Sequence, residues 1–397
     1  MWLVPALRFP EFSGEWKEER LDEIAELSKG VGISKEQLSE DGEPCILYGE
    51  LYTKYKSEII RKVISKTNIE SSNLKRSKRN DVIIPCSGET AIDIAVARCI
   101  PFDNILLGGD LNIIRLHKDD GAFMAYQLNG KRKIDIAKLA QGVSVVHLYG
   151  ENLKSIKTYN PCLQEQQKIV KLLSMFDERI EAQNKIIEDL KKLKSAISKH
   201  LFARKDLLET TICLSNIATL KNGYAFQSGK YNALGKWKIL TITNVSGERY
   251  INDKDCNCII NLPNDIQDHQ VLKEGDILIS LTGNVGRVSL CKNGDYLLNQ
   301  RVGLLQLAKN VNQEFLYQIL SSQKFENSMI ACGQGAAQMN IGKGDVESYV
   351  LPYSSNGNNI LWVAKILHSY DECIINEMRK LTLLTMQKQY LLIQMFI

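Results

Sequence analysis

One glycine-rich turn and one basic run are the parts of this sequence best suited to binding a polyanion. The turn, residues 282–287, reads Thr-Gly-Asn-Val-Gly-Arg and follows a predicted strand at 276–280. Its glycines let the backbone approach a ligand closely, while the polar side chains can donate hydrogen bonds to phosphates or base edges. The basic run holds four cations within five positions: Lys75, Arg76, Lys78 and Arg79. Both segments predict contact with nucleic acid; the alternatives are a plain hairpin turn and a solvated basic loop.

Further candidate contacts are polar or aromatic side chains that lie beside predicted strands. The run 222–227 reads Asn-Gly-Tyr-Ala-Phe-Gln, and 299–301 reads Asn-Gln-Arg. Beyond the basic run, the candidate DNA-binding residues are Ser87, Thr90, Tyr224, Phe226, Gln227, Thr282, Asn284, Arg287, Asn299 and Arg301.

The overall charge does not by itself indicate a nucleic-acid partner. The 397 residues carry 50 Lys and Arg against 46 Asp and Glu, a net charge of +4. Residues 161–205 hold 10 of these cations and 6 of the anions, which leaves 40 against 40 elsewhere. Any affinity for DNA must therefore come from local clusters.

No catalytic or metal-binding motif is present in the sequence. There is no phosphate-binding GxxxxGK[ST] loop, no GxGxxG, and no histidine pair at the spacing of a zinc site. Residues 160–163 resemble the Asn/Asp-Pro-Pro-aromatic loop of amino methyltransferases but lack the second proline and the aromatic residue. The ten cysteines include no CxxC pair, which predicts reduced thiols in a cytoplasmic protein. A binding role is favoured over an enzyme, with no catalytic residue and no metal.

The sequence contains an internal repeat, with Leu214 lying 193 positions after Leu21. All matches occur in one order at a nearly constant offset, so they predict a duplicated domain pair. The paired segments are 21–27 with 214–220, 81–88 with 276–283, 123–128 with 315–320, 141–142 with 334–335, and 176–180 with 370–374.

Each half ends in a long segment with apolar residues at alternating spacings of four and three. That spacing is the heptad pattern of a coiled coil, and an ordinary core helix is the alternative. The predicted seam consists of Ile169, Leu173, Phe176, Ile180, Ile187 and Leu190 in the first helix, and Val363, Leu367, Ile374, Leu381 and Leu384 in the second. Polar residues interrupt both seams at equivalent places, namely Gln183 and Lys194, and Glu377 and Lys388.

These observations predict an α+β protein with two β-rich mixed α/β domains separated by two long antiparallel coiled-coil helices, as a pseudo-twofold repeat. The expected segments are a first domain at 1–160, a helix at 161–205, a second domain at 206–352 and a helix at 353–397. With the helices centred on each other, Lys194 would face Glu377 and Gln183 would face Lys388.

Several of these motifs, in this order, resemble those of type I restriction–modification specificity subunits. The similar segments are 7–16, 48–52, 163–170, 222–226, 275–283 and 299–301. The resemblance covers essentially the whole chain. One departure is the segment at 353–360, which lacks the Glu-Gln-Gln pattern of the first helix start. Another is 87–92, which lacks the arginine of 282–287; we therefore expect the two domains to read different sequences.

The resemblance implies a non-catalytic subunit in which each β-rich domain is a target recognition domain for one half of a split double-stranded DNA sequence. The helices would set the gap and dock modification (methyltransferase) subunits, which restriction (translocase–nuclease) subunits would join. S-adenosylmethionine, ATP and magnesium would belong to those partners. The alternatives are a single-chain DNA-modifying enzyme with an unrecognised catalytic site, and a coiled-coil scaffold without a role at DNA.

Overall fold

A computed structural model describes residues 3–70, 72–333 and 339–397, and it contains two compact units. Unit 1 is the chain up to Asn184 together with Arg379–Ile397, and unit 2 is Lys185–Met378. The repeat pair 334–335 lies outside the described residues. Each unit combines a β-rich domain with part of both long helices, α7 (Leu163–Ala203) and α11 (Gly357–Gln394).

Unit 1 contains two main sheets. The first is antiparallel, in the order β2-β11-β7-β9 (Ala25–Lys29, Leu111–Leu116, Asp81–Pro85, Arg98–Ile100). The second has the order β3-β5-β4-β10-β6 (Leu38–Ser39, Ser65–Thr67, Glu43–Ile46, Leu106–Leu107, Lys75–Arg76), with β10 parallel to β4. Every residue of β7 is buried, as expected for a strand covered on both faces.

Unit 2 repeats this topology. Its antiparallel sheet has the order β15-β22-β19-β20 (Ala218–Asn222, Val302–Leu307, Ile277–Ser280, Val288–Leu290). Its second sheet has the order β17-β16-β21-β18 (Asn257–Ile259, Trp237–Leu240, Tyr296–Leu298, Val271–Leu272), with β21 parallel to β16. Within these two sheets the strands correspond one to one, except that β3 has no equivalent among the described residues of unit 2.

Two-stranded ribbons lead into the long helices. The strands β1 (Lys17–Arg20) and β13 (Lys157–Asn160) pair before α7, and β14 (Thr210–Cys213) and β23 (Val350–Tyr353) pair before α11. A further ribbon joins β8 (Ser87–Gly88) to β12 (Val146–His147).

Shorter helices complete both units. Those of unit 1 are α1 (Leu21–Ile24), α2 (Glu50–Thr53), α3 (Ala91–Ile94), α4 (Gly121–Asn129), α5 (Lys133–Lys138), α6 (Gly150–Leu153) and η1 (Lys35–Gln37). Those of unit 2 are α8 (Gln313–Leu320), α9 (Gln323–Cys332), α10 (Lys343–Glu347), η2 (Leu214–Asn216), η3 (Ser228–Lys230) and η4 (Asp268–Gln270). The matched helices α4 and α8 begin alike, because Asp120 and Asn312 accept hydrogen bonds from the amides of Phe123 and Phe315.

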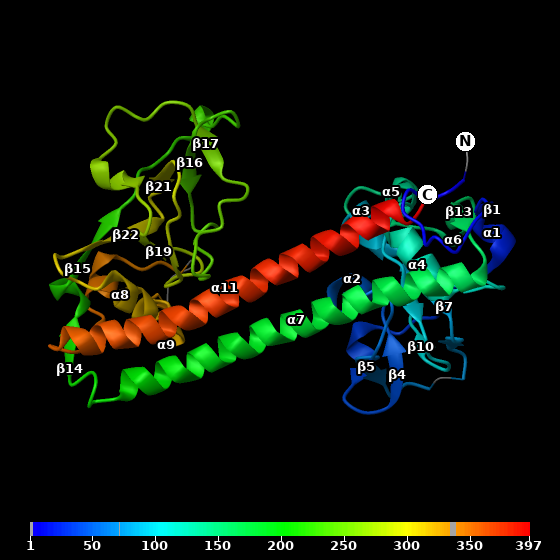
Figure 1. The fold of residues 1–397 in the computed structure, drawn as a ribbon, viewed down its shortest axis with the longest axis horizontal. Helices are drawn as coiled ribbons and strands as arrows, with labels where there is room; N and C mark the ends of the chain where they lie inside the picture. The colour runs from blue at the N-terminus through cyan, green and yellow to red at the C-terminus, as the bar shows by residue number, and fades with distance from the viewer. Residues whose placement is uncertain (1–2, 71, 334–338) are drawn as a thin grey trace. The chain divides into compact units, whose positions relative to one another are not determined.

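Within each unit, the stretches of α7 and α11 run antiparallel. In unit 1, α4 lies beside the first turns of α7 and the last turns of α11 (Figure 1), where Leu173 and Leu392 share a buried cluster. In unit 2, Leu201 near the end of α7 shares a cluster with Val363 near the start of α11. The expected α+β architecture with two repeated domains and long antiparallel helices is confirmed.

All eleven predicted seam residues are buried or half-buried. The buried ones are Ile169, Leu173, Ile187, Val363, Leu367 and Ile374, and the half-buried ones are Phe176, Ile180, Leu190, Leu381 and Leu384. Their assignment as the seam of a coiled coil stays a prediction.

The expected partners of the seam lysines are wrong. The ammonium of Lys194 binds Asp371 at 2.6 Å, and that of Lys388 binds Asp177 at 2.5 Å. Both acceptors lie six positions before the residues expected, Glu377 and Gln183. The physical reason is that packing at the helix ends sets the register, whereas the prediction centred the helices on their polar interruptions.

Candidate nucleic-acid interface

Three of the predicted segments of unit 2 come together at one end of its antiparallel sheet. The amide of Leu281 donates to the carbonyl of Arg301 at 3.0 Å, and the amide of Gln300 donates to the carbonyl of Tyr224 at 3.0 Å. The loops after β15 and β19 and before β22 are therefore joined by their backbones. Thr282 also forms a bridge with Asn340, a residue that the sequence did not single out.

Side chains from these loops line a shallow polar hollow of about 400 Å³: Thr282, Gln300, Arg301 and Asn340. Arg301 is exposed, and its guanidinium shares the hollow with the hydroxyl of Thr282 and the amides of Gln300 and Asn340. Such groups are the donors and acceptors that read base edges and hold phosphates.

The glycine-rich turn exposes one of its predicted contact residues, whereas another is bound by a neighbouring side chain. Gly283 and Gly286 have φ of +72° and +78°, so both need the left-handed region that favours glycine. The turn leaves Asn284 exposed, whereas the Arg287 guanidinium lies 3.5 Å from the carboxylate of Glu326 on α9. Arg301, and not Arg287, is the arginine in the polar hollow.

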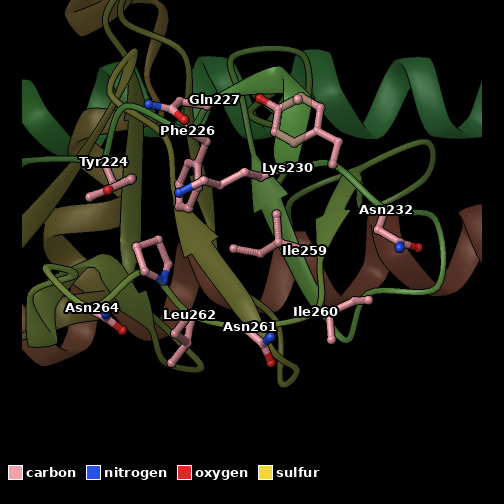
Figure 2. A pocket seen from close by; sticks show the side chains of 13 residues that line it. Tyr224, Phe226, Gln227, Lys230, Asn232, Ile259, Ile260, Asn261, Leu262 and Asn264 are labelled. Atoms are coloured by element: carbon pink, nitrogen blue, oxygen red, sulfur yellow. The ribbon is translucent and has the colours of Figure 1, made fainter.

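A second hollow of unit 2, of about 470 Å³, lies where the run 224–227 meets the second sheet (Figure 2). Tyr224 and Phe226 lie with their ring centroids 4.9 Å apart, and the Tyr224 hydroxyl donates to Asp265 at 2.8 Å. That hydrogen bond raises the pKa of Tyr224. In Figure 2, Phe226 and Lys230 lie centrally among the labelled side chains, with the amides of Asn232, Asn261 and Asn264 around them.

The sequence prediction found Tyr224, Phe226 and Gln227 but missed the other residues of this hollow. Tyr231, Asn232 and the segment 259–264 also line it. Ile259 ends the strand β17 and residues 260–264 follow it, whereas Tyr231 and Asn232 lie between η3 and β16. No motif and no repeat match marked any of these residues.

The corresponding face of unit 1 is built from different residues. The backbone amide of Cys86 donates to the backbone carbonyl of Asp110, as that of Leu281 does to the carbonyl of Arg301. Asp110 in unit 1 therefore occupies the position that Arg301 has in unit 2. The Ser87 hydroxyl donates to the Asp110 carboxylate at 3.3 Å, and the Lys29 ammonium lies 3.1 Å from that carboxylate. His147 pairs with Ser87 as Asn340 pairs with Thr282.

The basic run of unit 1 lies at the other end of β7. Asp81 begins the strand and its carboxylate accepts from the Lys78 amide, whereas Ser87 follows its last residue. A strand of five residues spans about 17 Å at 3.3 Å per residue. The structure therefore does not bring the two predicted clusters of unit 1 together.

Besides Ser87, three further predicted side chains of unit 1 have protein partners. Arg76 forms an ion pair with Glu43 at 2.7 Å, which raises the pKa of Arg76. The Arg79 guanidinium donates to the carbonyl of Pro101. The Thr90 hydroxyl caps α3 by accepting from the amide of Asp93. Lys75 is half-buried and Lys78 exposed.

Within the parts of the chain that the structure describes, no group of three or more His, Cys, Asp or Glu side chains could hold a metal ion. No helix among those residues is long and apolar enough to cross a membrane.

Comparisons with known proteins match this architecture. The family model described as "Type I restriction modification DNA specificity domain" matches twice, at residues 13–192 and 209–386. The chain is 27% identical over 349 residues to the type I restriction enzyme MjaVIII specificity subunit of Methanocaldococcus jannaschii, covering 81% of this chain and 78% of that protein. It is 25% identical over 269 residues to the putative MjaX specificity subunit of the same organism, covering 62% and 61%.

Solved structures share the fold. The S subunit of a type I restriction–modification system from M. genitalium superposes with a TM-score of 0.60 at 19% identity and covers 99% of each chain. A structure described as showing complex assembly and conformational transition of the type I R-M system gives a TM-score of 0.56 at 15% identity and covers 95% of this chain and 96% of that one. The specificity subunits among these relatives are non-catalytic. With two matched domains that span most of its length, this chain belongs to the type I restriction–modification DNA specificity family.

Proposed function

We propose that this protein is the subunit that reads a split DNA target for a type I restriction–modification enzyme. Each unit would carry one recognition domain, at 1–160 and at 206–352, and the helices at 161–205 and 353–397 would join them. The observation that carries the proposal is one two-sheet frame built twice, with different polar groups at the equivalent loops. Arg301 and Thr282 occupy in unit 2 the positions of Asp110 and Ser87 in unit 1. Two readers of this kind would recognise two different half-sites.

Direct contacts to DNA would be made by the loop faces of the two units. In unit 2 the candidates are Tyr224, Phe226, Gln227, Thr282, Asn284, Asn299 and Arg301, with Arg287 at the edge because Glu326 holds it. In unit 1 they are Ser87 and Thr90, with Lys75, Arg76, Lys78 and Arg79 as contacts at the opposite end of β7. Phosphate contacts release counterions, so binding should weaken with salt by a log–log slope of about 0.9 per contact.

The partners follow from the family. The helices, with their apolar seams, would dock modification (methyltransferase) subunits, and restriction (translocase–nuclease) subunits would complete the enzyme. S-adenosylmethionine, ATP and magnesium would be bound by those partners.

The test is to co-express the chain with its modification subunits and to map which adenines they methylate. We expect a split and asymmetric motif. Methylation at a single continuous motif would contradict the proposal. Methyl transfer from S-adenosylmethionine by the purified chain without partners would favour a single-chain modifying enzyme instead.

A further inference from the structure

Four buried side chains form a polar network where the recognition domain of unit 1 meets both long helices. The Lys388 ammonium lies 2.5 Å from the Glu58 carboxylate and 2.5 Å from that of Asp177. The Tyr126 hydroxyl donates to the other oxygen of Asp177 at 2.5 Å. All four residues are less than a tenth exposed. Lys388 comes from α11 and Asp177 from α7, while Glu58 and Tyr126 come from the recognition domain.

Unit 2 has a corresponding network. The Lys194 ammonium lies 2.6 Å from one oxygen of Asp371, and the other oxygen accepts from Arg249 at 2.9 Å and from Gln318 at 2.6 Å. Arg249 also forms an ion pair with Glu314. Burial opposes the charge of Arg249, but the hydrogen bond and the charge of Glu314 outweigh it and raise the pKa of the guanidinium.

The helices contribute the same pair in both networks, whereas the recognition domains contribute opposite charges. The carbonyl of Glu58 accepts from the amide of Cys99 at 2.8 Å, and the carbonyl of Arg249 accepts from the equivalent amide of Leu290 at 2.7 Å. Glu58 in unit 1 and Arg249 in unit 2 therefore occupy equivalent backbone positions. The glutamate binds the lysine of the helix pair, and the arginine binds its aspartate. The Asp–Lys pair accepts a domain residue of either sign.

A hollow lies beside each network, at one side of the junction between the domain and the helices. A hollow of about 560 Å³ in unit 1 is lined by Asp177 and its neighbours Ile180 and Asn184, with Tyr55 and Ser57 opposite. A hollow of about 380 Å³ in unit 2 is lined by Asp371, Arg249 and Lys194, among others. Hydrogen-bonded ion pairs tolerate a narrow range of distance and angle, whereas apolar surfaces can slide. On the side of the junction where the hollow lies, the polar network supplies the directional contacts, while apolar clusters pack the domain on the helices elsewhere.

We propose that Glu58 and Arg249 are positioning residues that fix the angle of each recognition domain on the helix pair, and thereby the gap between half-sites that the subunit accepts. The inference rests on the proposed function for its effect on the gap. The effect on the angle within each unit does not depend on DNA.

The DNA experiment uses the chain assembled with its modification subunits. Methylation rates are measured on duplexes with unchanged half-sites and a gap that is one base pair shorter or longer than the preferred one. Glu58→Gln and Arg249→Met should each reduce the discrimination between gaps at least fivefold and leave the preferred half-site sequences unchanged.

Matched controls come from exposed ion pairs at the same junctions. Arg61 binds Glu178 on α7 at 2.7 Å in unit 1, and Lys191 on α7 binds Glu248 at 2.8 Å in unit 2, with all four side chains more than a third exposed. Exposed pairs contribute little to geometry or stability. Arg61→Gln and Glu248→Gln should therefore keep the gap discrimination of the wild type.

A second measurement works without DNA. Spin labels at Lys66 of β5 and Met175 of α7, both exposed positions of unit 1, report the angle of the domain on the helix. The exposed residues Cys162, Cys332 and Cys373 are first replaced by serine. Glu58→Gln should broaden the distance distribution, and Arg61→Gln should not.

The outcomes separate the two proposals. If the wild-type complex reads no split target, the proposed function fails, and the label distances still decide the positioning role. If Glu58→Gln leaves both the gap discrimination and the distance distribution as in the wild type, the positioning role is wrong, even if the melting temperature falls by several degrees.

Discussion

The two units share a frame and differ at their loop faces. Both have an antiparallel four-stranded sheet in the same order, a second sheet with one parallel pair, and a helix-borne aspartate and lysine beneath. At the loop faces, Asp110 with its partner Lys29 replaces the exposed Arg301, and His147 replaces Asn340.

A second difference concerns the residues after the first strand of the antiparallel sheet. The amides of Tyr224 and Val31 make equivalent hydrogen bonds to Leu298 and Leu107, so these residues correspond. In unit 1, Ile33 fills a small aliphatic cluster, whereas in unit 2 Phe226 and Tyr231 border an open hollow. The groups that hold the fold are retained, while the groups that face outward have diverged. Under the proposed function, duplication with divergence of this kind would give two readers of different specificity.

The largest expected effect of a single change is at Arg301. Arg301→Ala should weaken binding to the half-site read by unit 2 about tenfold or more, because a well-placed arginine contact is worth about 1–3 kcal/mol. Dissociation constants of the assembled complex, measured on duplexes altered in one half-site at a time, check this. Arg287→Ala is the matched control, with an effect below about threefold because Glu326 already binds that guanidinium. An equal loss at both half-sites would contradict the division of labour.

The aromatic hollow should contribute less. Tyr224→Val installs the residue that unit 1 has at the equivalent position. We expect about a fivefold loss of affinity for the half-site of unit 2, because stacked or packed aromatic contacts with bases are worth about 1–3 kcal/mol when complete. Tyr224→Phe separates the ring from the hydroxyl bonded to Asp265. The reciprocal change Val31→Tyr, at an exposed position, should leave the affinity of unit 2 unchanged. Equal affinities for wild type and Tyr224→Val would remove the hollow from the interface.

A change of charge tests the face of unit 1. Asp110→Asn removes a carboxylate from the loop face and releases Lys29, so binding should strengthen about threefold at low salt. The gain should disappear near 1 M salt, where the screening length is about 3 Å. Titrations at two salt concentrations measure it. Asp41→Asn, in the turn between β3 and β4, is the control for net charge alone, and an equal gain there would show that Asp110 is not at the interface.

The smallest expected effect is at Glu209, whose carboxylate binds the residues just before α11. Hydrogen bonds from its own backbone amide and from Ser354 and Ser355 lower the pKa of Glu209 to about 2. Because this pKa is below its ordinary value of 4.5, the carboxylate stabilises the fold above pH 4.5, and that contribution is lost as pH falls toward 2. Glu209→Gln should thus lower the melting temperature slightly at pH 7, and the difference from wild type should shrink at pH 3. A constant difference across that range would contradict the assignment.

The sequence was sufficient for the frame because the frame is encoded by patterns. The repeat offset predicted two similar domains, and the spacing of residues such as Leu173 and Leu367 predicted both long helices. The loop face was harder to predict because it is assembled by backbone hydrogen bonds between distant segments. Nothing in the sequence showed that Asn340 pairs with Thr282, or that Lys78 lies at the far end of β7 from Ser87.

The predicted register of the two long helices was wrong for a related reason. The segments 176–180 and 370–374 were matched as repeats, but the carboxylates of Asp177 and Asp371 were not connected with the lysines. Asp177 and Asp371 lie at equivalent positions of the two helices. Because buried charges need partners, these two carboxylates were the available indication of where the lysines bind. Its use would have placed Lys194 and Lys388 correctly.

Unit 1 is discontinuous in sequence, and this has a consequence for how the protein is made. Its aromatic cluster joins Trp16 and Phe123 to Leu392, Met395 and Phe396. During translation, the amino-terminal domain must wait for the 194 residues of unit 2, Lys185–Met378, and for the last turns of α11 before that apolar surface is covered. A ribosome that stops early releases a chain with this surface open, which marks it for chaperones and proteases. Incomplete synthesis should therefore yield degraded protein instead of a reader with one working half.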